Sequence, residues 1–371
     1  MSDAASTYLA LAEPDRAKHL WRYTPWRHVH PTGSTSDLPE TSAPLLTLTT
    51  MSGVAAPDTV RLSSATAADV ERLSGGIDFK EGGTAGAFIE ALTGGEATVL
   101  SIDAGCHCSE PLVLNIEASG AVSALHLLLD VGDCSEVEIA TVIQGDADWT
   151  GLLREGRIGA SAILDDVVVQ RTAGRLLRLD GIVHERDAQV MSATVAANGS
   201  RVKADLRHLL EGRGANLRVL GSLLATSSQH QDHHIEIQHA ARDSVSRLAW
   251  HAACSGKSTT IGTGMLRIDK GATGSDAAQL FHNLLLSEKA KANSIPELEV
   301  LEFEVVGCGH GTANGPPDAD QAFYLQARGL SAAETRATLT AAFLNATLSK
   351  MGSEVMHQWL LEQIGRYLES I

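Results

Sequence analysis

The segment VVGCGHGTANG, residues 305–315, places one thiol and one imidazole among glycines. Side chains two positions apart point to the same face of an extended chain, so Cys308 and His310 would lie side by side. The glycines next to them would leave only hydrogens on the opposite face. A thiolate and an imidazole are suitable ligands for soft and borderline metal ions. The spacing therefore predicts a small metal site, and tight turns remain an alternative reason for the glycines.

A second polar cluster is the segment HQDHHIEIQH, residues 230–239. If it is a strand, one face carries two histidines and two carboxylates: His230, Asp232, His234 and Glu236. Such a set can bind a divalent metal, as in the cupin-like, metal-dependent enzymes. In the alternative interpretation this face is solvated, and His233 and His239 on the other face are hydrogen-bonded interior residues.

The segment AGCHCSEP supplies two further thiols, Cys106 and Cys108, which would share one face of an extended chain. A single C-x-C lacks the second pair of ligands that a structural zinc site requires. The chain has five cysteines. Because their number is odd and they are widely scattered along the sequence, they do not indicate a disulfide framework.

Several other functions are not supported by any motif. The sequence has neither a G-x-S-x-G elbow nor an H-E-x-x-H pair. The segment ACSGKST lacks the first glycine of a phosphate loop, because position 251 is His, so we expect no nucleotide to bind this chain. The formal charge of -16 and the lack of a Lys/Arg cluster argue against a nucleic-acid partner.

The elements that must position these residues change character along the chain. From Glu96 to about residue 270, short runs of alternating Val, Ile and Leu follow one another, with turn residues between them and no helix. More than ten such strands are too many for one ordinary sandwich, and they predict a solenoid or a very large barrel.

Helical signals are confined to the two ends. Residues 1–95 read as a mixed, partly helical region with a short helix over 12–23 and a linker or extended edge segment from Thr32 to about Pro57. After the strand-rich region, 96–315, capping patterns begin helices in residues 316–371, with Ser331 and Glu334 forming one such pattern. No run of apolar residues approaches a membrane span and no secretory signal is recognisable, so we expect a cytoplasmic protein without a membrane partner.

Several segments, read in order, resemble the SufB/SufD family of iron-sulfur cluster assembly proteins. The resemblance is carried by residues His230, Asp232, His239 and Ser246 and by the segments LWRYTPWR, GMLRIDKGATGSDAAQ, LLLSEKAKANSIPELEV, CGHGTANG and QAFYLQARGLS. It is most specific between residues 262 and 345. No cysteine matches the second reactive cysteine of the SufB branch, which favours a SufD-type identity.

The resemblance implies a mostly β chain with a right-handed parallel β-helix core flanked by N-terminal and C-terminal helical regions. It also implies a non-catalytic scaffold in which His310 helps to hold a nascent iron-sulfur cluster at a subunit interface, while Cys308 matches the cysteine of the same motif. The implied partners are a SufB-like subunit, or a second copy of this chain, and a SufC-like ATPase. The ATPase would dock on the C-terminal helical region, where residues 341–351 are the family-like stretch to test.

Overall fold

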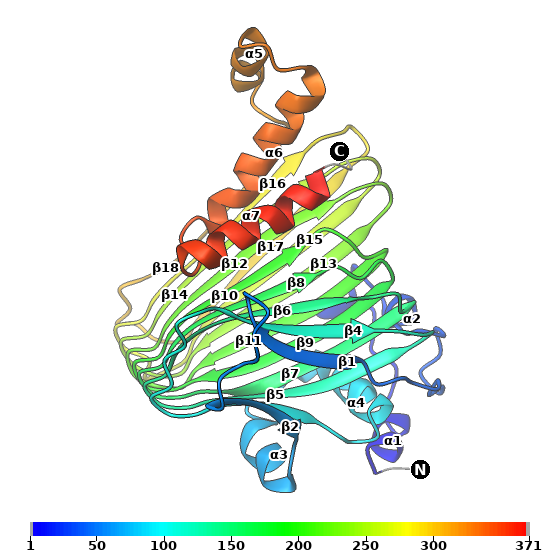
Figure 1. Cartoon of the computed structure of the whole chain (residues 1–371), viewed down its shortest axis with the longest axis vertical. Coiled ribbons are helices and arrows are strands. Elements are labelled where there is room, and N and C mark those ends of the chain that lie inside the picture. The colour runs from blue at the N-terminus through cyan, green and yellow to red at the C-terminus, as the bar shows by residue number, and fades with distance from the viewer. Residues whose placement is uncertain (1–2, 369–371) are drawn as a thin grey trace.

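The computed structural model describes residues 3–368, and strands dominate it (Figure 1). The strands form two nine-stranded sheets, and from β3 onward successive strands alternate between them, so that each pair of strands forms one turn of a solenoid. Sheet I contains, in spatial order, β1 (Leu45–Thr50), β4 (Leu112–Ala118), β6 (Glu136–Gly145), β8 (Ile163–Gln170), β10 (Gln189–Ala196), β12 (Asn216–Ala225), β14 (Val245–Cys254), β16 (Asp276–Leu285) and β18 (Gly307–Gly315). Sheet II contains β17 (Lys291–Val300), β15 (Thr259–Ile268), β13 (His230–His239), β11 (Arg201–Leu210), β9 (Arg175–His184), β7 (Trp149–Ile158), β5 (Ser123–Val131), β3 (Thr98–Ile102) and β2 (Val60–Ser64).

Helices lie before and after this solenoid. The N-terminal ones are α1 (Asp3–Leu9), the 3-10 turn η1 (His19–Trp21), α2 (Trp26–Val29), α3 (Ala67–Leu73), the 3-10 turn η2 (Lys80–Gly82) and α4 (Gly83–Leu92). The C-terminal ones are α5 (Ala319–Ala327), α6 (Ala332–Leu348) and α7 (Glu354–Leu368). The structure confirms a mostly β chain with a parallel β-helix core and helices at both ends.

The N-terminal region contributes strands as well as helices. Strand β1 pairs with β4 and strand β2 pairs with β3, and both pairs are antiparallel, whereas every other ladder among the described strands is parallel. The predicted helix over 12–23 is wrong, because only the turn η1 forms there. The chain bends in this segment so that Trp21 and Trp26 meet edge to face, with ring centroids 5.3 Å apart, in the core beneath α4.

The interior of the solenoid is a hydrophobic core made by the inward-facing side chains of the strands. Aromatic side chains fill the space that glycines leave on neighbouring strands. A Cβ added at Gly221 would lie 2.2 Å from the Trp250 ring, and one at Gly264 would lie 2.8 Å from Phe281. These contacts are closer than any side chain allows, so glycine is required at both positions.

The interior also holds a charged network of two arginines and two aspartates. Asp180 on β9 accepts two hydrogen bonds from Arg178, at 3.0 and 2.5 Å, and lies 3.8 Å from the Arg154 guanidinium. Arg154 in turn donates to Asp166 at 2.5 Å. Burial alone would raise the pKa of Asp180, but the two guanidinium groups lower it below its ordinary value.

Both outer faces of the solenoid are covered in part. The N-terminal helices pack on sheet II, where Trp149 donates its indole N–H to the Val29 carbonyl at 2.7 Å. The C-terminal helices α6 and α7 lie across sheet I (Figure 1), with Leu348 and Leu360 fully buried against it. Helix α5 projects away from the sheets, and none of its residues is buried.

One half-buried carboxyl under the C-terminal helices, that of Asp165, makes stability depend on pH. Burial, together with the charge of Glu138, raises the pKa of Asp165 from 3.8 to about 7. Because the folded pKa is the higher one, stability is present below pH 3.8 and is lost as pH rises toward 7. We therefore expect Asp165→Asn to raise the free energy of unfolding at pH 8 by about 1–3 kcal/mol, after allowance for solvent screening, and to change it little near pH 4. Urea denaturation at both pH values tests this, with Asp146→Asn, at an exposed position, as the control; equal effects of Asp165→Asn at the two pH values would contradict it.

Candidate functional site

Cys308 and His310 lie on β18, the last strand of sheet I. The strand pairs with β16 in parallel register, which places Cys308 opposite Ala277 and His310 opposite Gln279. Ala277 and Gln279 are buried on the inner face of β16. Cys308 and His310 therefore share the inner face at the end of the solenoid, as the alternation in the sequence indicated.

The two side chains differ in their surroundings. The Cys308 thiol is free and half-buried against the solenoid core, and burial raises its pKa. The His310 side chain is exposed. Beside it, the Gln279 side chain is fully buried and donates to the Glu297 carbonyl at 2.9 Å, but its Oε1 atom has no hydrogen-bond partner. The site thus combines a partly buried thiol and an accessible imidazole.

Further along β18 the inner face remains polar. Asn314 accepts from Asn283 on β16 at 2.6 Å and from Ser294 on β17 at 3.4 Å. These contacts tie the last strands of both sheets together. The sequence alone did not reveal Gln279 and Asn283, because only strand pairing brings β16 beside β18. For β18 itself, the alternation of residues 308, 310, 312 and 314 indicated which side chains share the inner face.

The glycines of β18 are not in turns. Gly307, Gly309 and Gly311 lie within the strand, and none has a positive φ. A Cβ added at Gly309 would meet nothing within 4 Å. Neither backbone conformation nor internal packing therefore requires glycine at 309, and its effect is to leave the outer face of the strand bare.

The solenoid is open at this end. Strands β17 and β18 are the outermost strands of their sheets, and within residues 3–368 nothing pairs with their outer edges. The loop between them exposes apolar side chains, with Phe303 99% and Val306 74% exposed. Unpaired edges and exposed apolar residues are features of a surface that another chain covers.

The histidine-rich strand β13 occupies a different place. His230, Asp232, His234 and Glu236 share the outer face of sheet II, as predicted, but this face is not solvated, because the N-terminal region covers it. Its carboxylates bind cationic side chains rather than lying free for a metal. Asp232 lies 3.1 Å from the Lys203 ammonium, and Glu236 lies 3.0 Å from Lys80.

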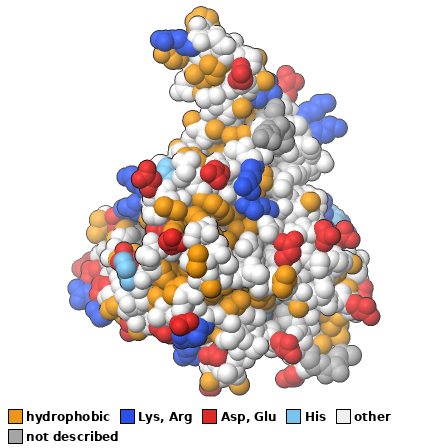
Figure 2. All heavy atoms as spheres, in the orientation of Figure 1, with side chains coloured by type: hydrophobic (Ala, Val, Ile, Leu, Met, Phe, Trp, Pro, Cys, Tyr) orange, Lys and Arg blue, Asp and Glu red, His pale blue; other side chains and the backbone are white. Residues whose placement is uncertain are grey.

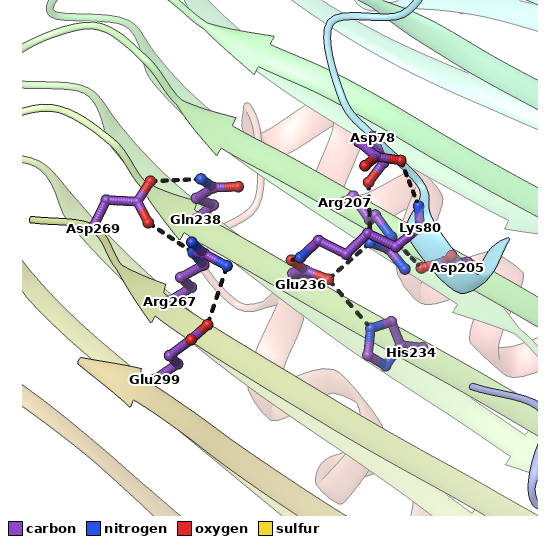
Figure 3. A network of polar contacts seen from close by, with 10 residues as sticks. All are labelled: Asp78, Lys80, Asp205, Arg207, His234, Glu236, Gln238, Arg267, Asp269 and Glu299. Atoms are coloured by element: carbon purple, nitrogen blue, oxygen red, sulfur yellow. Dashed lines mark hydrogen bonds and ion pairs between the residues drawn. The ribbon is translucent and has the colours of Figure 1, made fainter. Parts of the chain in front are cut away.

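Figure 3 shows this network around Glu236, which also pairs with Arg207 at 2.9 Å. Burial alone would raise the pKa of Glu236, but hydrogen bonds from His234 and Lys80 and the Arg207 charge lower it to about 2. A carboxylate held this way is already neutralised. The arrangement explains the polar residues of β13 as ion-pair partners and does not favour a metal-dependent enzyme at this strand. On the opposite face, His239 lies 2.7 Å from the Ser246 hydroxyl, as expected for a hydrogen-bonded interior histidine. His233 is interior as expected, but the hydrogen bonding predicted for it is wrong: neither ring nitrogen has a partner among the described residues, and the ring packs 5.3 Å from that of Trp250.

Cys106 and Cys108 lie beside β6, six strands from β18 in sheet I. At about 4.8 Å per strand this is about 29 Å from Cys308. Their sulfur atoms are 3.7 Å apart and both thiols are free. Burial and the neighbouring Cys106 raise the pKa of Cys108 to about 12. The structure therefore does not bring these thiols to the open end.

The C-terminal helices present one face to solvent and one to the solenoid. In residues 341–351, Leu344, Leu348 and Met351 are buried on sheet I, so much of this stretch is occupied by the chain itself. The projecting helix α5 is free, with Phe323 74% and Tyr324 57% exposed, and Figure 2 shows apolar side chains on this arm. Among residues 3–368, no helix is both long and apolar enough to cross a membrane.

Comparisons with known proteins agree with this architecture. The family model described as "SUF system FeS cluster assembly, SufBD core domain" matches residues 114–343, from β4 into α6. An iron-sulfur cluster assembly SufBD family protein of Mycobacterium tuberculosis is 27% identical over 285 residues, which are 74% of this chain and 71% of the relative. A SufBD family protein of Mycobacterium leprae is 26% identical over 279 residues, or 72% and 71% of the two chains. The iron-sulfur cluster assembly protein SufD of Escherichia coli is 24% identical over 182 residues, or 49% and 43%.

Proposed function

Because this chain belongs to the SufB/SufD family of iron-sulfur cluster assembly proteins, we propose that it is a non-catalytic, SufD-type scaffold subunit of a cytoplasmic assembly complex. It pairs through the open end of its solenoid with a SufB-like subunit or a second copy of itself. A nascent iron-sulfur cluster is then held and released at this junction. The observation that carries the proposal is the position of Cys308 and His310 on the inner face of β18, an edge strand.

The two side chains supply part of a cluster site. Thiolate and imidazole are both ligands of iron in iron-sulfur proteins, and a cluster needs more ligands than this pair provides. The remaining ligands come from the partner chain. Since burial raises the pKa of Cys308, its thiol is protonated in the free chain and loses its proton as iron binds. A site divided between two subunits opens when the subunits move apart, which provides a route for release.

The open end supplies the surface for pairing. The outer edges of β17 and β18 carry backbone donors and acceptors that another strand can satisfy by extending the sheets. Glycine at 309 lets a partner backbone or a cluster approach the outer face of β18 closely. Apolar residues at 303 and 306 are placed to be covered at the same time.

The projecting arm supplies a second contact. Helix α5 is held away from the solenoid by α6, and its exposed aromatic residues suit docking of a SufC-like ATPase. We place this contact on α5 and the adjoining turn of α6, because the later part of α6 is buried on sheet I. ATP hydrolysis by the docked subunit then drives the separation of the paired scaffold chains.

Phe303→Glu tests the pairing surface. A carboxylate at a nearly fully exposed position leaves the isolated chain stable, but it must be desolvated when the open end is covered. We expect the variant to bind its scaffold partner at least about tenfold more weakly, measured by interferometry or analytical ultracentrifugation. Val54→Glu, at a position 63% exposed on the N-terminal region, is the matched control. Unchanged affinity in Phe303→Glu would place the interface elsewhere.

Affinity purification of the native protein from its own cells tests the proposal as a whole. We expect an ATPase and a SufB-like chain to co-purify, with iron and acid-labile sulfide in the complex. A chain that purifies alone, as a monomer and without either partner, would contradict it.

A further inference from the structure

A second group of metal-ligating side chains lies far from the open end, on the outer face of sheet II. Glu90 comes from α4, His126 from β5 and Glu155 from β7, and one ligand atom from each lies within 4.8 Å of the others. His126 Nε2 and Glu155 Oε2 are 3.0 Å apart. The other Glu155 oxygen accepts from the Gly75 backbone N–H at 2.9 Å. That bond fixes the carboxylate and leaves its second oxygen directed at the cluster.

Local structure explains why the three side chains meet. In the β5 and β7 ladder, His126 is paired with Leu153 and Glu155 with Leu128, so the two polar residues are diagonal neighbours on the same face. Helix α4 packs on this face through Phe88 and Ile89. Glu90 follows them at the edge of the helix and reaches the same position.

Among residues 3–368, the carboxylates of the group have a single ionic partner, His126, which lies 3.0 Å from Glu155. Elsewhere on the outer face of sheet II, buried carboxylates pair with cationic side chains, such as Asp232 with Lys203 and Glu236 with Arg207 (Figure 3 shows the second pair). Within residues 3–368, neither Glu90 nor Glu155 forms an ion pair with a lysine or arginine. One buried and one half-buried carboxylate beside one imidazole form a site that a cation would neutralise.

One member of the group, His126, lines a cavity. A hollow of about 620 Å³ lies between α3, α4 and the start of β5, and His126 is part of its lining together with Thr66, Thr93 and Leu125. This volume admits a hydrated ion and leaves water beside the ligands. The His126 imidazole thus borders a space that solvent and ions can enter.

We propose that Glu90, His126 and Glu155 bind one divalent metal ion, separate from the cluster site at Cys308 and His310. Two carboxylates and one imidazole suit Mn²⁺, Fe²⁺ or Zn²⁺, whereas Mg²⁺ and Ca²⁺ prefer oxygen ligands alone. Strand β7 is five strands from β17 in sheet II, about 24 Å at the usual strand spacing, so the two sites do not share ligands. The ion ties α4 to two strands and stabilises the N-terminal cover of sheet II.

Titration of the full-length chain with Mn²⁺, followed by the electron paramagnetic resonance of the free ion, tests this. Mn²⁺ is the probe because it has little affinity for thiolates, so the cysteines do not contribute. We expect one Mn²⁺ per chain, at least tenfold weaker binding in Glu90→Gln and His126→Gln, and unchanged binding in His310→Ala. Glu297→Gln is the matched control. The Glu297 carboxylate also lies 3.0 Å from a histidine, His19, but among the described residues this pair does not belong to a group of three possible metal ligands.

Two further measurements keep the proposal testable if a variant folds poorly. The wild-type chain should melt at a higher temperature with Mn²⁺ than without it, because an ion that binds only the folded state stabilises it. Pulsed spectra of the bound ion should show coupling to one imidazole nitrogen. Wild-type protein that binds no Mn²⁺ up to millimolar concentration, or that binds it without imidazole coupling, would overturn the assignment, as would unchanged binding in a folded Glu90→Gln chain.

Discussion

A chain carrying His310→Ala should fold like the wild type, form its complexes and fail to support cluster assembly. The side chain is exposed and makes no hydrogen bond or ion pair within the described residues, so its loss removes no contact that stabilises the isolated chain. Its removal leaves Cys308 as the single protein ligand that this subunit offers. Removing a residue that hydrogen-bonds to a metal ligand typically lowers metal affinity or activity at least about tenfold, and removing the ligand itself costs at least as much. We therefore expect at least about a tenfold drop in cluster yield. Iron and acid-labile sulfide per complex, and the activity of a cluster-dependent enzyme in the same cells, measure the effect.

His107→Ala is the control for this variant. That imidazole is also exposed and contacts Glu136 at 3.0 Å, beside β6 and about 29 Å from β18. We expect it to leave cluster yield unchanged. Cys308→Ser separates the two ligands, since it keeps the imidazole and replaces sulfur with a poor iron ligand. If cells with His310→Ala mature cluster enzymes at the wild-type level, His310 has no role in the site.

The strand architecture could be predicted from the sequence because each strand is a local pattern. In β13, the alternation places Ile235 and Ile237 inside the solenoid and Asp232 outside, as the sequence indicates. The capping box of Ser331 and Glu334 likewise begins α6 as predicted, with both of its hydrogen bonds formed. Such signals depend only on residues near one another in the chain.

The sequence does not show which outer faces are covered, because the covering segments are far away in the chain. Asp232 is buried because the segment around Thr24, more than 200 residues earlier in the chain, covers it. The Thr24 hydroxyl donates a hydrogen bond to the Asp232 carboxylate at 2.5 Å. The helical spacing of apolar residues in α7 predicts Val355 on its buried stripe, but Val355 is 56% exposed and Met356 is buried in its place. The precise rotation of a helix depends on the surface it meets, and that surface is assembled only when sheet I forms.

Clusters assembled from several elements are the hardest to predict. No local motif joins Glu90, His126 and Glu155, which come from a helix and two strands. The interior arginines were equally hidden, because Arg178 and Asp180 lie in a run of leucines that reads as an ordinary buried strand. Strand pairing then places Asp180 next to Arg154 on β7. The solenoid therefore buries charges that are compensated only when adjacent turns are in register.

Asp180→Asn should destabilise the protein more than any surface change. The four charges of Arg154, Arg178, Asp166 and Asp180 cancel, and the substitution keeps the shape of the side chain but leaves one positive charge uncompensated in the dry interior. Removing one partner of a buried ion pair costs about 3–5 kcal/mol, and we expect a loss of that size in the free energy of unfolding. Urea denaturation followed by circular dichroism measures it.

Asp103→Asn is the matched control, because Asp103 also pairs with an arginine, Arg61, but at the surface. We expect its denaturation midpoint to stay within experimental error of the wild type. A small effect of Asp180→Asn, equal to that of the control, would mean that water or a shifted Asp166 carboxylate compensates the two arginines. A large effect would show that the ion network fixes the register of β7 and β9, because a slip of one residue would remove Asp180 from both guanidinium groups.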